Sequence, residues 1–301
     1  MAPTTYRANC HCGRFVYEAT FPEPLTKAFS CNCSICVRKG YVHSFLLSGT
    51  DITIVKGSLD DLDSYAFGDK KYQHKFCGTC ASPVLIVPTD PAKAKALNVR
   101  CFQGPVDVWA LEQVTFDGAS LDPPFEEKPF TGIEPTGEPR GDGTPTMYHG
   151  SCHCGAVRVA LRSQPLDETL DREKLGDRVV ECDCSICQRN GYRWFYPKAD
   201  QVSVHDPEGA LKYYAFGKFV NRKSFCGRCG VAISNLPTDL TEEQIAQLPE
   251  VARSEESVAW RNRIANMSAI NTRVLYGVDL GKLPVKQHNG YKLISNDYVN
   301  P

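Results

Sequence analysis

The spacing of the cysteines constrains this chain more than any other feature of its sequence. Fourteen of the fifteen cysteines fall into six clusters, within which neighbouring cysteines are separated by only one or two residues. The total is odd, which argues against a complete disulfide framework. Cys-x-Cys and Cys-x-x-Cys pairs instead bring thiolates toward one metal ion from a tight turn. We therefore expect metal sites, with zinc as the metal.

The same clusters occur twice in the same order. CHCG at 10–13 recurs at 152–155, CNCSICVRKGY at 31–41 recurs as CDCSICQRNGY at 182–192, and FCGTC at 76–80 recurs as FCGRC at 225–229. Between the last two clusters, YAFG at 65–68 recurs at 214–217. The offsets of 142, 151 and 149 residues differ only by short insertions. The chain is therefore a tandem duplication.

The duplication predicts two domains joined by a linker. The length of 301 residues suits about two domains of ordinary size. Residues 117–146 contain six prolines and five glycines, a composition that excludes a helix interior or a central strand. We expect a first domain at 1–118, a linker at 119–146 and a second domain at 147–301.

Secondary structure within each copy is predicted to be mainly β. Short β-branched or aromatic runs bounded by turn residues indicate strands, at Phe15–Thr20, Asp51–Val55 and Val84–Val87 in the first copy and at Ala156–Leu161, Gln201–Val204 and Val231–Ser234 in the second. An insertion at about 240–265 in the second copy has helical composition instead. Thr241 and Gln244 are spaced as a capping box at its start, and Pro249 interrupts it. We expect a surface or packing helix there, with a lid over a site as the alternative.

The seven clustered cysteines of each copy divide into four and three. The first and last pairs of a copy can close a four-thiolate tetrahedron, which is the arrangement of a structural zinc site. The central Cys-x-Cys-x-x-Cys supplies only three sulfurs, and three protein ligands with a vacant position are typical of catalytic zinc. Three thiolates leave the zinc unit at about −1, which disfavours activation of water and suits a sulfur ligand. A thiol is therefore the expected substrate.

A closed central site is the alternative. A histidine could complete the three-cysteine turn and make it a second structural site. His43, seven residues after Cys36, is the candidate either for a fourth ligand or for an acid–base group. The second copy has Trp194 at the aligned position, so one reading is that a single copy is active. Cys101 lies outside all clusters, and we expect it to be a buried free thiol.

The order CxCG, CxCxxCxxxG and FCxxC resembles the family of the glutathione-dependent formaldehyde-activating enzyme and centromere protein V, in both halves of the chain. The resemblance implies a β-tent of small antiparallel sheets in each copy, with a structural and a catalytic zinc. The implied structural ligands are Cys10, Cys12, Cys77 and Cys80, then Cys152, Cys154, Cys226 and Cys229. The implied catalytic ligands are Cys31, Cys33 and Cys36, then Cys182, Cys184 and Cys187. Up to four zinc ions per chain follow. One departure is Ala81, where the family has a glycine and the second copy keeps Gly230.

Other residues near the three-cysteine turns are candidates for binding and catalysis. Glutathione carries two carboxylates, and Arg38, Lys39 and Arg189 follow the turns closely enough to pair with them. Tyr41 and Tyr192 could bring a hydroxyl to the site. Fused copies could also take the place of a homodimer, with sites near their contact, and a homodimer of the chain stays open.

The sequence thus predicts a zinc-dependent carbon–sulfur lyase or adduct-forming enzyme that acts on glutathione, or a conjugate of it, with an electrophilic small molecule. Two alternatives are a non-catalytic, zinc-stapled interaction module and a zinc enzyme of small-molecule biosynthesis that acts on an oxygen substrate. The net charge of −1 argues against a nucleic-acid partner. No run approaches the roughly 18 apolar residues of a membrane helix, and the first residues contain no apolar signal segment. We expect a cytoplasmic protein.

Overall fold

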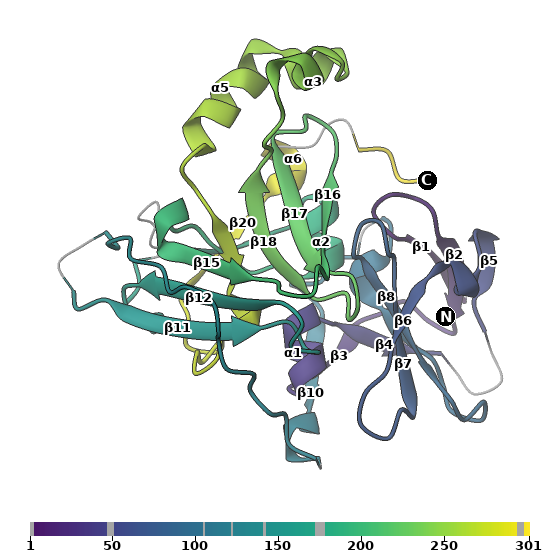
Figure 1. Cartoon of the computed structure of the whole chain (residues 1–301). Helices are drawn as coiled ribbons and strands as arrows, with labels where there is room; N and C mark the ends of the chain where they lie inside the picture. The colour runs from purple at the N-terminus through teal and green to yellow at the C-terminus, as the bar shows by residue number, and fades with distance from the viewer. Residues whose placement is uncertain are drawn as a thin grey trace.

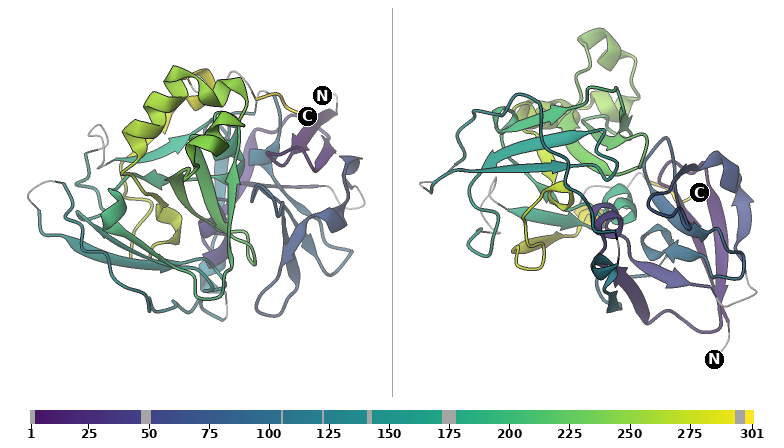
Figure 2. Two further views of the ribbon diagram at one scale, coloured as in Figure 1. Left: turned by 45° about the horizontal axis from the view of Figure 1, so that its top comes forward. Right: turned by 60° about the horizontal axis from the view of Figure 1, so that its bottom comes forward.

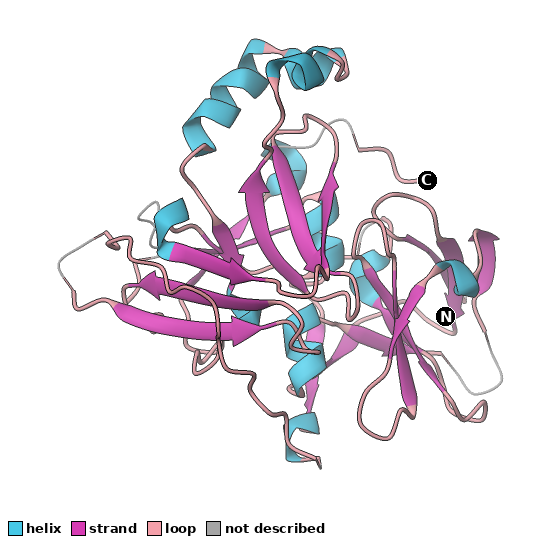
Figure 3. Cartoon of the chain, viewed as in Figure 1, coloured by secondary structure: helices cyan, strands magenta, loops and turns pink. Residues whose placement is uncertain are grey.

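The computed structural model describes residues 3–46, 51–104, 106–121, 123–140, 143–171, 178–293 and 298–301. Strands dominate both halves of the molecule (Figure 3). Each copy has a three-stranded sheet and a seven-stranded sheet. The prediction of a mainly β chain with two similar domains is confirmed.

The first copy builds its sheets from ten strands. The three-stranded sheet has the order β1 (Thr4–Asn9), β2 (Val16–Phe21) and β5 (Thr53–Lys56). The seven-stranded sheet has the order β10 (Glu112–Phe116), β3 (Lys27–Cys31), β4 (His43–Phe45), β9 (Ala96–Asn98), β8 (Pro83–Pro88), β7 (Tyr72–Phe76) and β6 (Asp63–Tyr65). Two 3₁₀ turns matter for the site, η2 (Val99–Cys101) and η3 (Gly118–Ser120). A third, η1 (Leu59–Asp61), precedes β6.

The second copy repeats this topology. Its three-stranded sheet has the order β11 (Thr146–Ser151), β12 (Arg158–Ser163) and β15 (Val202–His205). Its seven-stranded sheet, written in the opposite direction, has the order β20 (Val285–His288), β13 (Val179–Cys182), β14 (Trp194–Phe195), β19 (Ala269–Asn271), β18 (Ala232–Pro237), β17 (Asn221–Cys226) and β16 (Leu211–Ala215). The 3₁₀ turns η4 (Ala199–Gln201) and η5 (Thr272–Val274) lie between its strands.

The large sheets are mixed rather than purely antiparallel. β10 pairs with β3, and β20 with β13, in parallel, while the other pairs are antiparallel. Parallel neighbours require a long crossover connection. In each copy the last strand therefore returns from the far side of the domain and lies beside the strand that leads into the three-cysteine turn.

The strand predictions agree with the structure to within about two residues at most ends. The six predicted runs correspond to β2, β5, β8, β12, β15 and β18. The short helices α1 (Ser34–Lys39) and α2 (Ser185–Asn190) were not predicted. Each begins inside a three-cysteine turn and ends at a glycine in the left-handed conformation, Gly40 or Gly191, both with φ of 58°.

The insertion in the second copy is helical, as predicted. It contains α3 (Glu242–Ala246), α4 (Glu250–Arg253) and α5 (Glu255–Ile264), and Thr241 forms the capping box with Gln244. Pro249 is the N-cap residue of α4, so the insertion is divided at this position as predicted. Figure 1 shows these helices beyond the ends of β16–β18, on the side away from α1. A further short helix, α6 (Gly290–Leu293), follows β20. Among the described residues, none of the helices has both the length and the apolar character that a membrane crossing requires.

The two copies meet at a contact that we call the seam, formed by α1 and Gly40 on one side and α2 and Gly191 on the other. A Cβ atom on either glycine would come within 2.6 Å of the carbonyl oxygen of the other, so the seam requires glycine at both positions. α1 packs against η5 of the second copy and α2 against η2 of the first. Reciprocal contacts of this kind are those of a two-fold symmetric interface. Figure 2 shows the copies side by side in two further views.

The linker and the last residues add to these contacts. Arg158 donates to the carbonyl oxygen of Pro129 and to Thr131, which holds part of 119–146 against the second copy. At the other end, Tyr298 bonds to residues of the first copy, accepting from Asn9 Nδ2 and donating to the carbonyl oxygen of His11. The predicted domain boundaries stay a prediction.

Candidate metal centres

The outer cysteine pairs of each copy come together as predicted. Cys10, Cys12, Cys77 and Cys80 have all four sulfurs within 4.8 Å of one another, and so do Cys152, Cys154, Cys226 and Cys229. All fifteen cysteines are free of disulfides. The sulfur–sulfur distances given for these sets are 3.5–3.7 Å. A zinc tetrahedron with bonds of about 2.3 Å has edges of about 3.8 Å. The two four-cysteine sets therefore fit a structural zinc ion.

The central cysteines form two further sets. Cys31, Cys33 and Cys36 lie together in the first copy, and Cys182, Cys184 and Cys187 in the second, each with the sulfurs within 4.8 Å of one another. The backbone N–H of Cys33 donates to Cys31 Sγ, and that of Cys184 to Cys182 Sγ, both at 3.4 Å. Amide donors to sulfur are the usual outer partners of zinc thiolates. Both sets therefore fit zinc, with three protein ligands among the described residues.

A glycine lies against each three-cysteine set. A Cβ atom on Gly118, at the start of η3, would come 2.5 Å from Cys31 Sγ. In the second copy a Cβ atom on Gly290, at the start of α6, would come within hard contact of Cys182 Sγ. In each copy, the segment that follows the parallel last strand thus places a glycine, with no side chain, next to a cysteine sulfur of the candidate metal site. No pattern in the sequence indicates this role of the two glycines.

Unpartnered polar groups surround the first-copy set. His43 Nε2 lies 3.7 Å from Cys36 Sγ, but His43 is not part of the cluster of mutually close donor atoms. Within the described structure, the Tyr41 hydroxyl, Nδ1 of His43 and of His74, and Nζ of Lys39 are buried without a hydrogen-bond partner. Buried polar atoms are rarely left unpaired unless a ligand, water or function accounts for them. This cluster marks the first-copy set as a candidate active site.

Burial shifts the pKa values of these groups. It lowers the pKa of His43 to about 4, the nearby Cys31 opposing the shift, so the ring is neutral at neutral pH. Burial also lowers the pKa of Lys39 to about 8, although nearby thiols, Cys229 and Cys36 among them, act to raise it. The hydroxyl of Tyr41 has its pKa raised by burial and, to a smaller extent, by the thiols of Cys36, Cys101 and Cys33. These shifts are typical of functional clusters.

The second-copy set has a different surrounding. The Tyr192 hydroxyl and Nε1 of Trp194 lack a partner among the described residues, and the rings pack with centroids 4.5 Å apart. Lys223 occupies the position aligned with His74, and its Nζ donates to Asn235 at 2.7 Å. Trp194 has an indole where His43 of the first copy has an imidazole, so this position of the second copy has no titratable ring.

The three basic residues predicted to bind carboxylates lie in the seam. The Arg38 guanidinium donates to the carbonyl oxygens of Ser151 and Ser34 and stacks on Phe125. Arg189 donates to the carbonyl oxygens of Asn9 and Ser185 and to two asparagine side chains. Lys39 Nζ lies 4.4 Å from the centre of the Phe76 ring. Their glutathione-binding role stays a prediction, and both guanidinium groups already have protein partners.

The histidines of the two CHCG motifs connect the copies, a role that the sequence analysis missed. His11 hydrogen-bonds with Ser185 (3.1 Å) and Tyr214 (2.9 Å) of the second copy. His153 makes the same contacts with Ser34 (3.0 Å) and Tyr65 (2.8 Å) of the first copy. The serines belong to the CxCSIC turns and the tyrosines to the repeated YAFG segments. Each histidine thus joins the four-cysteine set of one copy to the three-cysteine set of the other.

Cys101 is a buried free thiol, as predicted. It is fully shielded from solvent and donates to the carbonyl oxygen of Pro83 at 3.4 Å. Burial raises its pKa to about 12, so the thiol is neutral. The aligned residue of the second copy is Val274, which supports a packing role.

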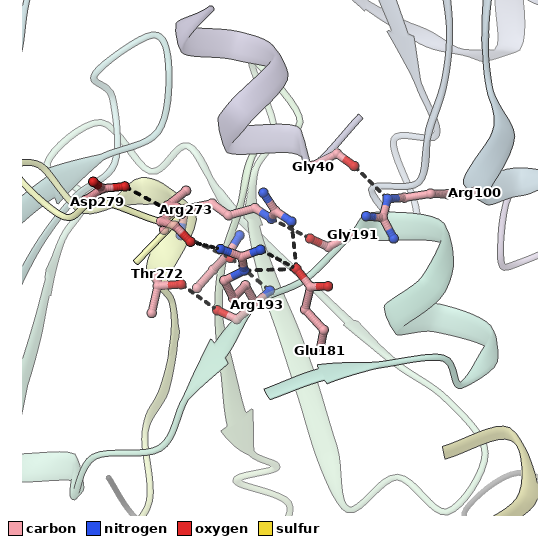
Figure 4. Close-up of polar contacts among 11 residues, drawn as sticks. Gly40, Arg100, Glu181, Gly191, Arg193, Thr272, Arg273 and Asp279 are labelled. Carbon is pink, nitrogen blue, oxygen red and sulfur yellow. Dashed lines mark hydrogen bonds and ion pairs between the residues drawn. The ribbon is translucent and has the colours of Figure 1, made fainter. Parts of the chain in front are cut away.

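The seam also holds a cluster of charged residues beside the first-copy set. Glu181 Oε1 accepts from Arg193 at 2.9 Å and from Arg273 at 3.0 Å (Figure 4). Arg273 Nε donates to the carbonyl oxygen of Gly191, and Arg100 Nε to that of Gly40, both at 2.7 Å. Arginines of both copies therefore converge at the axis that relates the copies.

Known proteins share the cysteine-bearing parts of this sequence. The model of a family described as "glutathione-dependent formaldehyde-activating enzyme" matches residues 5–113 and again residues 147–262, which together exceed half of the chain. The chain belongs to this family. A crystal structure of a Rhodobacter sphaeroides protein is also similar, with 25% identity over 36% of this chain and 99% of its own, and a TM-score of 0.32. Each copy of this member of the glutathione-dependent formaldehyde-activating enzyme family thus contains one matched region, and the two regions together include all fourteen clustered cysteines.

Proposed function

We propose that this protein makes or breaks a carbon–sulfur bond between a thiol, glutathione or a conjugate of it, and an electrophilic carbon. The observation that carries the proposal is a set of three thiols, fit for zinc, beside buried polar groups that have no partner in the described structure. The family assignment supports glutathione as the thiol. Formaldehyde is the first electrophile to test, because the family description names it.

In this proposal, Cys31, Cys33 and Cys36 hold the catalytic metal. A zinc ion bound there would supply a soft Lewis acid that takes a sulfur ligand and lowers the pKa of a thiol. The four-cysteine sets would hold structural zinc and fix the ends of the strands that carry the central turn. The glycine at 118 leaves the backbone close to Cys31 and keeps side chains out of that space.

The addition step transfers one proton, and neither reactant is oxidised or reduced. The sulfur of the deprotonated thiol forms a bond to the carbonyl carbon, the π pair of the carbonyl moves to its oxygen, and that oxygen takes a proton. The reverse step breaks the carbon–sulfur bond and returns the proton. His43 and Tyr41 are the proposed carriers of this proton, because both lie beside the set with a polar atom free of protein partners in the described chain.

The first copy is the proposed catalytic copy. It combines two imidazoles, an ammonium and a phenol around its three thiols, whereas the second copy has Trp194 in place of His43. In this proposal Tyr192 serves packing in the second copy, where its ring contacts that of Trp194.

Turnover measurements with two matched variants test this function. Glutathione and formaldehyde, and a panel of glutathione conjugates, are assayed with the zinc-loaded protein, with Cys33→Ser and with Cys184→Ser. The proposal expects Cys33→Ser to lose activity by at least about 100-fold and Cys184→Ser to retain most of it. If neither change alters the turnover of any thiol adduct, the catalytic assignment fails and a zinc-stapled interaction module becomes the better account.

A further inference from the structure

A cavity of about 290 Å³ lies at the seam, and its walls come from both copies. The first copy contributes Cys31, Cys36 and Tyr41 of the candidate active site, together with Arg100. The second copy contributes Glu181, Arg193 and Arg273. The volume is at the lower end of the roughly 300–1,000 Å³ that is usual for small-molecule sites. One cavity thus joins two of the three first-copy cysteines to the arginine cluster in Figure 4.

The cavity carries an excess of positive charge. Its lining includes three guanidinium groups and one carboxylate, a balance of +2 among the described residues. The carboxylate of Glu181 is shared between Arg193 and Arg273, with side chains only 11–16% exposed. Arg100 is 8% exposed, and the one hydrogen bond given for its guanidinium group in the described structure joins Nε to the carbonyl oxygen of Gly40. Buried cations without counter-charges are costly, so the cluster favours an anion in the cavity.

The metal centre does not remove this excess. Three thiolates and a zinc ion would add a charge of about −1, which leaves the cavity positive before any ligand enters. Arginine presents a planar fork of donors that matches a carboxylate, and such pairs are among the strongest hydrogen bonds in proteins. The expected ligand is therefore a small organic anion with one or more carboxylates.

The cavity is asymmetric although the copies are repeats. Glu181 aligns with Ser30 and Arg193 with Val42, so one pair of charges exists only in the second copy. Yet the cysteines that line the cavity belong to the first copy. Charged side chains of the second copy and cysteines of the first therefore line one cavity, and the residues aligned with Glu181 and Arg193 in the first copy carry no charge.

We propose that Arg193 and Arg273 of the second copy, together with Arg100 of the first, form the carboxylate-binding half of a composite site whose metal-binding half lies in the first copy. The three arginines hold the carboxylates of the thiol substrate, and its sulfur lies toward Cys31 and Cys36, which line the same cavity. This inference rests on the proposed function for the identity of the thiol.

Calorimetric titration of the zinc-loaded full chain tests the inference with three probes: glutathione, S-methylglutathione and glutathione diethyl ester. Two variants change the charge of the cavity in opposite directions, Arg193→Gln to +1 and Glu181→Gln to +3. Arg193→Gln is expected to weaken binding of S-methylglutathione by about tenfold or more, since it removes a charge-assisted hydrogen bond to a carboxylate. Glu181→Gln is expected to bind the same probe at least as tightly as the parent.

The ester removes the carboxylates without changing the protein, so it guards against a variant that folds poorly. It is expected to bind at least about tenfold more weakly than glutathione. Equal affinity of acid and ester, equal weakening by Arg193→Gln and Glu181→Gln, or no binding of glutathione at all would overturn the inference.

Separate measurements of binding and of turnover distinguish a failure of this inference from a failure of the proposed function. Cys33→Ser is expected to lose turnover and keep its discrimination between S-methylglutathione and the ester. Loss of turnover in Cys33→Ser with unaltered binding in Arg193→Gln would leave the function standing and remove the carboxylate site. Charge-dependent binding without turnover of any thiol adduct would leave the carboxylate site standing and contradict the proposed function.

Discussion

At the scale of single residues, the glycines against the three-cysteine sets control how closely the backbone approaches the sulfurs. The thiols of Cys33 and Cys36, together with the backbone N–H groups of Cys33 and Gly118, lower the pKa of Cys31 to about 2. An amide this close to the sulfur stabilises the thiolate form that binds metal.

Gly118→Ala is therefore expected to weaken zinc binding at the first-copy set by about 10–100-fold, the usual effect of an altered outer partner. The added methyl group would lie 2.5 Å from Cys31 Sγ and force the sulfur or the backbone to move. Competition with a chromophoric chelator measures the affinity. Gly281→Ala is the matched control, because the nearest atom to its new methyl group is a side-chain oxygen at 3.3 Å. Equal affinities in both variants would contradict this role of Gly118.

A second residue-scale prediction concerns the position after the last cysteine. Ala81 and Gly230 both have positive φ, 61° and 70°. A methyl group on Gly230 would also come within 2.6 Å of the Phe76 ring across the seam. Chemical denaturation should therefore show Gly230→Ala less stable by about 2 kcal/mol or more, and Ala81→Gly unchanged or more stable by up to about 1 kcal/mol. A stabilising effect of Gly230→Ala would exclude this explanation.

The sequence predicts the metal ligands well and the charged cavity poorly. Cysteine spacing is local, so the two kinds of cysteine set follow from the order of the clusters alone. The cluster of Glu181, Arg193 and Arg273 depends on how the copies dock, which repeats do not reveal. The one available signal is that Glu181 and Arg193 replace Ser30 and Val42 of the first copy.

At the scale of elements, the helical insertion is a separate addition to the second copy. Arg261 of α5 donates to the carbonyl oxygen of Lys218, and Lys218 pairs with Glu256. These contacts attach α5 to the loop between β16 and β17. The side-chain cap of α3 is exposed, and the helix is only five residues long.

Thr241→Ala is expected to destabilise α3 by about 1 kcal/mol through loss of its N-cap. Hydrogen exchange should show roughly fivefold faster exchange of the α3 amides, with zinc content and turnover unchanged. A change in turnover at constant zinc content would instead favour the alternative role of the insertion as a lid.

Strand positions are predictable here because each strand carries its own pattern of burial. The parallel pairing of β10 with β3 and of β20 with β13 cannot be predicted in this way, because nothing local to β10 and β20 specifies their partner strands. The contact between the ends of α1 and α2 cannot be predicted from the sequence either. Gly40 and Gly191 are recognisable as helix-ending residues, but their contact with each other is a property of the assembled chain.

At the scale of the whole molecule, the two copies form one unit. The core of the second copy includes Ile35 and Tyr41 of the first, and the first-copy core is packed against Tyr214 of the second. The reciprocal bonds of His11 and His153 add polar contacts on both sides of the seam. A single chain thereby makes the contacts that two identical subunits make in a symmetric dimer.

Cleavage of the linker should therefore leave the halves together. A protease site introduced beside Ile133, which is 88% exposed, allows the folded protein to be cut. Size-exclusion chromatography of the cut protein is expected to give one peak with both fragments and the full zinc content. Separation of the fragments under native conditions would show that the seam does not hold the copies together.

The central claim is that the first-copy set leaves one position on its metal open to a substrate sulfur. Crystals of the zinc-loaded protein, grown with glutathione and measured at the zinc absorption edge, test it directly. The account predicts a metal held by Cys31, Cys33 and Cys36, with the glutathione sulfur about 2.3 Å away. A metal enclosed by these cysteines and His43, or the absence of metal at this set, would contradict it.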